Sequence, residues 1–193
     1  MSESHYFIAI PLSSNLQNLF SSWQEEIKGK VFYKQWPEKQ DLHITLKFLG
    51  AVADNKVLAL RKELKKIEEL SEFSIEAGSI GTFGNPSKPR VIWAGVDKTE
   101  SLTNLYAKIE TITASIGFPK ENREYRPHIT LAKKWAGDAA IANLEEIKDQ
   151  FTAVELLHVN HIVLYRIHPA KSPKYEVVQK YKLKRDEGNG PAD

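Results

Sequence analysis

The sequence contains no cysteine, and this absence excludes several kinds of functional site. Without thiols there are no disulfides, no thiolate metal centres and no cysteine nucleophile. No apolar run approaches the roughly 20 residues that a membrane-spanning helix requires. Residues 1–6 also lack the basic and apolar regions of a signal peptide. We therefore expect a soluble, cytoplasmic protein that does not enter a membrane.

The sequence has little net charge of either sign. Its formal charge is only +2, which is too small to give the general basic field of many nucleic-acid-binding proteins. If RNA is bound, the positive charge must therefore be local. Low hydrophobicity with high net charge, the signature of disorder, is absent too. With 193 residues, 41% of them hydrophobic, the chain is long enough for a full core.

The hydrophobic pattern alternates strands and helices, with no linker between them. Helical spacing of apolar residues predicts helices at 13–28, 54–67, 99–115 and 138–148. Apolar runs between turn residues predict strands at 6–12, 31–36, 42–49, 73–83, 90–96 and 127–133. The stretch 151–183 is expected to form two long strands joined by a turn at 169–173.

These elements form a rough repeat. Twice, a strand and a helix lead to a His-Ile-Thr-Leu strand and then to a further helix. This order predicts an α+β fold with mostly antiparallel sheets, in which two similar lobes face each other across a cleft. Residues 1–185 would form this one bilobal domain. Residues 186–193, which are polar and contain two glycines and a proline, would form a disordered tail.

The His-Ile-Thr-Leu tetrapeptides begin at His43 and His128. Because side chains alternate along a strand, His43 shares a face with Thr45, and His128 shares a face with Thr130. The isoleucine and leucine of each tetrapeptide lie on the opposite face and anchor the strand in a core. A recurring tetrapeptide can be structural, but the matching positions in the repeat favour a site in which the two polar pairs converge.

Strand alternation also predicts which of the nearby lysines face the same side as the histidines. Lys47 lies on the face of His43, and Lys134 lies on the face of His128. Lys133 has the opposite parity, so it reaches the same cleft only where the strand ends or bulges. A lysine contacts a phosphate as a point charge, without the two-pronged grip of an arginine.

Two imidazoles and two hydroxyls in one cleft suit phosphoryl transfer. With an unperturbed pKa near 6.5, one imidazole can act as base while another acts as acid. Threonine hydroxyls can donate hydrogen bonds to the oxygens of a phosphate. Neither tetrapeptide contains a carboxylate or a thiolate, and two histidines alone make a poor zinc site. No Ser-His-Asp arrangement for acyl transfer can be identified.

Around these residues the chain resembles the two-histidine (2H) phosphoesterase superfamily, whose signature is a pair of His-x-Thr-x motifs. The match is closest to the RNA 2',3'-cyclic phosphodiesterases, also called the 2'-5' RNA ligase or LigT-like family. It spans the chain from about Tyr6 to Leu183. The segments that carry it are 7–12, 42–50, 81–83, 89–93 and 126–131.

The resemblance implies a bilobal fold with pseudo-twofold symmetry, helices on the outside, and no metal or other cofactor. It also implies hydrolysis of a 2',3'-cyclic phosphate to a 2'-phosphomonoester. His43 would be the proton donor to the leaving 3'-oxygen, and His128 would be the proton acceptor that activates water. By microscopic reversibility the same pair could join a 2'-phosphodiester. Lys133 stands where family members often carry an arginine.

The candidate catalytic residues are therefore His43, His128, Thr45 and Thr130. The candidate substrate-binding residues are Lys133, Lys47, Arg126 and Tyr125. One of four aromatic residues is expected to stack on a base: Trp36, Phe83, Trp93 or Tyr125. The expected partners are RNA ends or cyclic-phosphate nucleotides, and the protein is expected to be a monomer.

Other interpretations stay open at this point. The chain could be a 2H phosphodiesterase for another small cyclic-phosphate compound, or a non-catalytic nucleotide- or RNA-binding module that keeps the cleft. His158 and His161 invite a metal-binding interpretation. In a strand their odd spacing would put them on opposite faces, which favours a structural role.

Overall fold

The structure, a computed structural model, describes residues 4–185. The predicted tail at 186–193 therefore lies outside the described residues. Within them the helices are α1 (Ser14–Lys28), α2 (Asp54–Glu63), α3 (Glu100–Ser115) and α4 (Leu144–Gln150), with short 3-10 helices at Lys39–Asp41 and Leu64–Glu69. The strands are β1 (Ser4–Pro11), β2 (Tyr33–Gln35), β3 (His43–Val52), β4 (Phe73–Asn85), β5 (Lys88–Val96), β6 (His128–Trp135), β7 (Val154–Val159), β8 (His161–Ile167) and β9 (Tyr175–Lys182).

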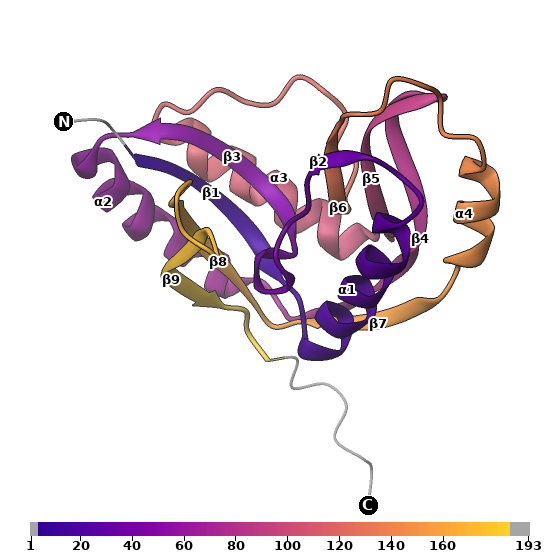
Figure 1. Cartoon of the computed structure of the whole chain (residues 1–193). Helices are drawn as coiled ribbons and strands as arrows, with labels where there is room; N and C mark the ends of the chain where they lie inside the picture. The colour runs from indigo at the N-terminus through magenta and orange to yellow at the C-terminus, as the bar shows by residue number, and fades with distance from the viewer. Residues whose placement is uncertain (1–3, 186–193) are drawn as a thin grey trace, which may run out of the picture.

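The strands form one curved sheet whose named pairs are all antiparallel. Their order is β7-β4-β5-β6-β3-β1-β8-β9, and β2 pairs with β6. The first lobe holds β3, β1, β8 and β9, and the second holds β6, β5, β4 and β7 (Figure 1). The lobes meet where β3 pairs with β6, at Ile44 and Ile129. The predicted bilobal α+β fold is thus confirmed.

The two long helices cross between the lobes. Helix α1 follows β1 of the first lobe but packs near β6 of the second, and α3 follows β5 of the second lobe but packs near β3 of the first (Figure 1). Each helix therefore supports the strand that carries the other lobe's tetrapeptide. Side chains from one helix can reach that strand directly, which matters for the site.

Local sequence accounts for both helices. The Ser13 hydroxyl accepts a hydrogen bond from the Leu16 amide, and the Thr99 hydroxyl accepts one from the Leu102 amide. Each such cap stabilises its helix by about 1 kcal/mol. Apolar residues at spacings of three and four then face the sheet and are buried: Leu16, Phe20, Trp23 and Ile27 on α1, and Leu102, Leu105, Ile109 and Ile112 on α3.

The fourth helix begins later than the sequence pattern predicts. The pattern predicts a start at Asp138, but α4 begins at Leu144. The preceding segment is held by the turn between β4 and β5, because Ile141 donates its amide to the Ser87 carbonyl and Lys88 donates to the Asp138 carbonyl. These tertiary hydrogen bonds replace the helical ones.

The stretch 151–183 forms three strands rather than the expected two. The chain leaves the second lobe at the end of β7 and enters the first lobe at the start of β8, with Asn160 between them. The Asn160 carbonyl accepts a hydrogen bond from the Leu183 amide at the end of β9, which fixes this crossover. Among residues 4–185, no helix is both long and apolar enough to cross a membrane.

Candidate active site

The register of β3 and β6 brings the two tetrapeptides together. Ile44 and Ile129 are direct partners and are fully buried. In an antiparallel pair the next residues outward lie opposite one another. His43 therefore lies beside Thr130, and Thr45 lies beside His128, all on the face opposite the core. The apolar residues of both tetrapeptides hold this four-residue square in place.

Both histidines are fixed by the backbone two residues earlier. His43 donates from Nδ1 to the Asp41 carbonyl at 2.7 Å, and His128 donates from Nδ1 to the Arg126 carbonyl at 2.8 Å. This bond selects the tautomer in which Nε2 carries the lone pair. The Nε2 of His43 is 3.0 Å from the Thr45 hydroxyl, which donates to it when the imidazole is neutral.

Burial lowers the pKa of both imidazoles. Desolvation is the largest cause of the fall in the pKa of His43 to about 4, and the positive charges of Lys133 and His128 add to it. The hydrogen bond to the Asp41 carbonyl opposes this fall. The pKa of His128 is also lowered by desolvation, against the opposing bond to the Arg126 carbonyl. Both imidazoles are therefore neutral near pH 7 in the empty cleft.

A β-bulge lies at the leucine that ends each tetrapeptide, and it reverses the alternation of side chains beyond that point. In β3 the partners on β1 skip Leu46, and in β6 the partners on β5 skip Leu131. A bulge inserts one extra residue, so the residues beyond it face the other way. Lys133 is thereby turned into the cleft with Thr130, which is the placement that a phosphate contact requires.

The bulge in β3 turns Lys47 out of the cleft. Its ammonium lies 2.6 Å from Glu110 of α3 and donates to the Pro119 carbonyl, and the residue is only 8% exposed. The expected place of Lys47 among the substrate contacts is therefore wrong. At the position in β3 that corresponds to Lys133 in β6 stands Phe48, which is 60% exposed.

The other two candidate substrate contacts lie at the edge of the site. Arg126 is exposed, with its guanidinium 3.7 Å from Glu124, while its carbonyl orients His128. Tyr125 stacks on Tyr106, with ring centroids 4.0 Å apart. Its hydroxyl donates to the Thr45 carbonyl. Tyr125 thus supports the backbone of β3.

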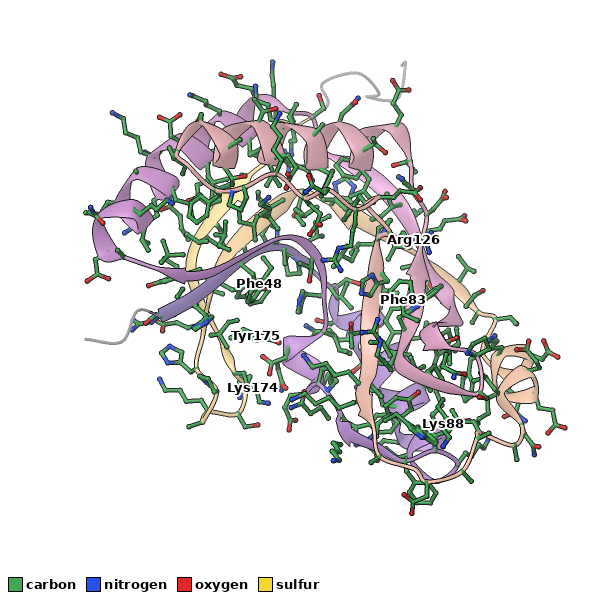
Figure 2. All side chains as sticks on the ribbon, turned by 90° about the horizontal axis from the view of Figure 1, so that it is seen from above. Phe48, Phe83, Lys88, Arg126, Lys174 and Tyr175 are labelled. Atoms are coloured by element: carbon green, nitrogen blue, oxygen red, sulfur yellow. The ribbon has the colours of Figure 1, made fainter. Side chains whose placement is uncertain are left out.

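The cleft itself has a volume of about 200 Å³. Its polar lining comes from His43, Thr45, Thr130, Lys133 and Asp41, and its other walls from Phe7, Pro37, Phe48, Ile167 and Tyr175. Figure 2 shows Phe48, Tyr175 and Lys174 on one side of the view, with Phe83 and Arg126 on the other. His128 adjoins this lining, and its ring packs edge-on against the Phe83 ring, with the two ring centroids 4.9 Å apart.

Asp41 ties the hairpin of β8 and β9 to the first histidine. Its carboxylate accepts hydrogen bonds from the amides of Lys174 at 2.8 Å and Tyr175 at 3.3 Å. Desolvation raises the pKa of Asp41 despite these two bonds, which act to lower it. Since the carbonyl of Asp41 also holds His43, one residue positions both the imidazole and the aromatic wall formed by Tyr175.

The four aromatic candidates for base stacking are placed differently from one another. Trp93 packs over Gly81 and is paired with Thr130, while Phe83 contacts His128. Trp36 donates from its indole nitrogen to the Tyr33 carbonyl. Among the cleft residues, the exposed aromatic is Phe48, which strand alternation alone assigns to the core.

Some site residues carry signals that strand alternation does not use. Asp41 stands two residues before His43, the place from which a backbone carbonyl can reach Nδ1. Tyr175 carries no such local signal, because only the fold brings its ring to the ring of His43, with the two centroids 5.3 Å apart. His158 lies 3.4 Å from Glu72, and His161 bonds to Asn160. Across residues 4–185 there is no group of three histidine, cysteine or carboxylate side chains placed to hold a metal ion.

The chain matches known proteins over most of its length. The model of the family described as LigT like Phosphoesterase matches residues 10–93 and 95–175. An RNA 2',3'-cyclic phosphodiesterase of Geobacillus stearothermophilus is 35% identical over 95% of this chain, and the match spans 58% of that relative's length. A protein of the same name from Bacillus subtilis (strain 168) is 33% identical, over 93% of this chain and 96% of its own length.

Solved structures of low sequence identity share the fold. Escherichia coli LigT complexed with 3'-AMP has a TM-score of 0.75 at 22% identity, covering 94% of this chain and 98% of that one. A protein of Thermus thermophilus has a TM-score of 0.76 at 20% identity, covering 94% and 99%. With the family match and the two His-x-Thr strands joined at one site, the chain belongs to the LigT like phosphoesterase family.

Proposed function

We propose that the chain is an RNA 2',3'-cyclic phosphodiesterase that uses His43 and His128 as acid and base and needs no metal ion. The observation that carries this proposal is the register of β3 and β6, which sets both histidines and both threonines on one face of the sheet. The name shared by the Geobacillus and Bacillus relatives supports the substrate class.

The proposed reaction is one in-line displacement at phosphorus. His128 takes a proton from water as its oxygen bonds to phosphorus, and the bond from phosphorus to the 3'-oxygen breaks. His43 gives a proton to that leaving oxygen, so the product is a 2'-phosphomonoester with a free 3'-hydroxyl. The hydroxyls of Thr45 and Thr130 donate to the non-bridging oxygens, where negative charge gathers in the transition state.

The negative charge of the substrate favours the protonated form of His43 that this reaction needs. In the empty cleft the pKa of His43 is about 4, so the proposed donor has no proton to give near pH 7. A bound phosphodiester anion favours the imidazolium form and raises the pKa of both histidines. With the anion bound, His43 takes up a proton from solvent, and it later gives this proton to the leaving oxygen.

Opposite walls of the cleft suit different parts of the substrate. Lys133 lies on the side of Thr130 and suits the phosphate, while Phe48 and Tyr175 offer apolar faces for the terminal base. Lys134 and Lys174 stand close enough to Lys133 that their charges lower its pKa, together with the larger effect of desolvation. This lysine cluster supplies the local positive charge that an RNA strand entering the cleft requires.

The experiment is hydrolysis of an oligoribonucleotide that ends in a 2',3'-cyclic phosphate, with EDTA present. We expect conversion to a 2'-phosphate end at an undiminished rate in the chelator. A His161→Ala variant, which loses an imidazole outside the cleft, should keep this activity. A 3'-phosphate product would refute the proposed bond choice, and loss of activity in EDTA would refute metal independence.

The same assay separates the alternatives. Hydrolysis of cyclic mononucleotides but not of oligonucleotides would indicate a small cyclic-phosphate substrate instead of RNA. Tight binding of the oligonucleotide without any turnover would indicate a binding module. Reversible 2'-5' ligation, a monomeric state and a cytoplasmic location stay predictions from the sequence.

A further inference from the structure

A single buried amide stands on the otherwise apolar inner face of α1. Gln24 is only 3% exposed and lies between Phe20 and Ile27, both fully buried. Its Nε2 donates to the Leu131 carbonyl at 2.9 Å and to the Pro37 carbonyl at 3.0 Å. Burying a primary amide is unfavourable unless it is hydrogen-bonded, and both protons of this one have a partner.

The carbonyl that Gln24 holds belongs to the bulge in β6. Leu131 is the residue that the partners on β5 skip, so its carbonyl needs a partner from outside that strand pair. The extra residue is also what turns Lys133 into the cleft. Without the bulge, alternation would put Lys133 on the buried face with Ile129.

The second bond of the same amide reaches the cleft wall. Pro37 lines the cleft together with Lys133. Because one NH2 group donates to both carbonyls, the distance between the bulge and the Pro37 segment is set by the planar geometry of the amide. Gln24 thus fixes two parts of the cleft while it touches none of the space inside it.

We propose that Gln24 is a positioning residue: it holds the β6 bulge and thereby directs Lys133 toward the substrate phosphate. The inference rests on the proposed function of the cleft and on the phosphate contact of Lys133. Its counterpart in the first lobe differs. There Glu110 of α3 pairs with Lys47, and the residue turned into the cleft is Phe48.

The test compares Gln24→Met with Lys133→Ala in hydrolysis of the cyclic-phosphate oligonucleotide. Methionine has a similar length but cannot donate a hydrogen bond. We expect KM to rise about tenfold in each variant, the loss expected for one charge-assisted hydrogen bond, with kcat little changed. The double variant should be no worse than Lys133→Ala alone, because both changes remove the same contact.

A matched variant separates positioning from plain stability. Tyr181→Phe also removes a donor to a backbone carbonyl, that of Arg61, outside the cleft. It should lower the melting temperature without raising KM. A second measurement is the pKa of His43 by NMR, which should rise in both Gln24→Met and Lys133→Ala as the nearby positive charge leaves. If Gln24→Met does not fold, the shorter Gln24→Asn serves in the same comparison.

The outcomes distinguish the two proposals. If Lys133→Ala raises KM but the Gln24 variants keep the wild-type KM and His43 pKa, the positioning role of Gln24 is wrong. If the two increases in KM multiply in the double variant, Gln24 and Lys133 act independently and the inference is again wrong. An unchanged KM in Lys133→Ala overturns the phosphate contact, and the role of Gln24 with it, while leaving cyclic-phosphate hydrolysis standing.

Discussion

At the scale of single residues, the site depends on which nitrogen each histidine presents. The backbone carbonyls of Asp41 and Arg126 accept hydrogen bonds from the Nδ1–H groups of His43 and His128. Under the proposed function, Nε2 is therefore the atom that gives or takes a proton on each ring. A carbonyl differs from a carboxylate here, because it orients the ring without adding negative charge that would stabilise the imidazolium. The low pKa of His43 follows from burial that no anion offsets until substrate binds.

These pKa shifts predict an acidic optimum for kcat/KM. The productive free enzyme has one protonated and one neutral imidazole, and both pKa values lie below 6.5. As pH rises above about 6.5 the imidazolium is lost, so kcat/KM should fall about tenfold per pH unit. At lower pH both imidazoles become protonated, so His128 can no longer accept a proton from water and kcat/KM should fall again.

The measurement is a pH–rate profile between about pH 4 and 9, which reports values for the coupled pair. Bound phosphate raises both pKa values, so the optimum of kcat should lie at a higher pH than that of kcat/KM. In Lys133→Ala the loss of a neighbouring positive charge should move the profile of kcat/KM upward in pH. A kcat/KM that stays flat or rises between about pH 7 and 9 would contradict the account.

At the scale of elements, strand alternation predicts the face of each histidine and threonine correctly but fails just beyond them. The bulges at Leu46 and Leu131 exchange the faces that alternation assigns to Lys47 and Lys133. Nothing in the local pattern marks the bulge in β6, because its support comes from Gln24, a residue 107 positions away from Leu131 in the chain. The helices α1 and α3 were predictable because their caps and apolar spacing are local.

The pairing of β4 with β5 gives a prediction of its own. A methyl group at Gly81 would lie 2.1 Å from the Trp93 ring, and that ring is packed in place beside Phe83. Gly81→Ala should therefore destabilise the protein by about 1–3 kcal/mol. Thermal unfolding measures this as a fall in melting temperature. Gly29→Ala is the matched control, since its new methyl group meets nothing within 4 Å.

An unchanged melting temperature in Gly81→Ala would show that the Trp93 ring can shift without cost. An equal fall in both glycine variants would point to a backbone effect instead of contact with the ring.

At the scale of the whole molecule, the two lobes share a plan but present different chemistry. The tetrapeptides, the bulges and the crossing helices repeat, whereas Phe48 in one lobe corresponds to Lys133 in the other. Under the proposed function, the aromatic side and the cationic side of this cleft would bind a nucleotide end in one direction only. The family resemblance predicted this bilobal fold well. The passage of the chain from β7 in the second lobe to β8 in the first could not be predicted from local sequence. The strand with which each pairs depends on contacts between residues far apart in the chain.

The central claim is that the two tetrapeptides form one catalytic unit. Single-turnover hydrolysis of the cyclic-phosphate oligonucleotide should slow about 10²- to 10⁴-fold in His43→Ala and in His128→Ala, the contribution typical of general acid–base catalysis. Because the two imidazoles act in one step, the double variant should be little slower than the slower single variant. Full activity in either single variant, or losses that multiply in the double variant, would contradict the account.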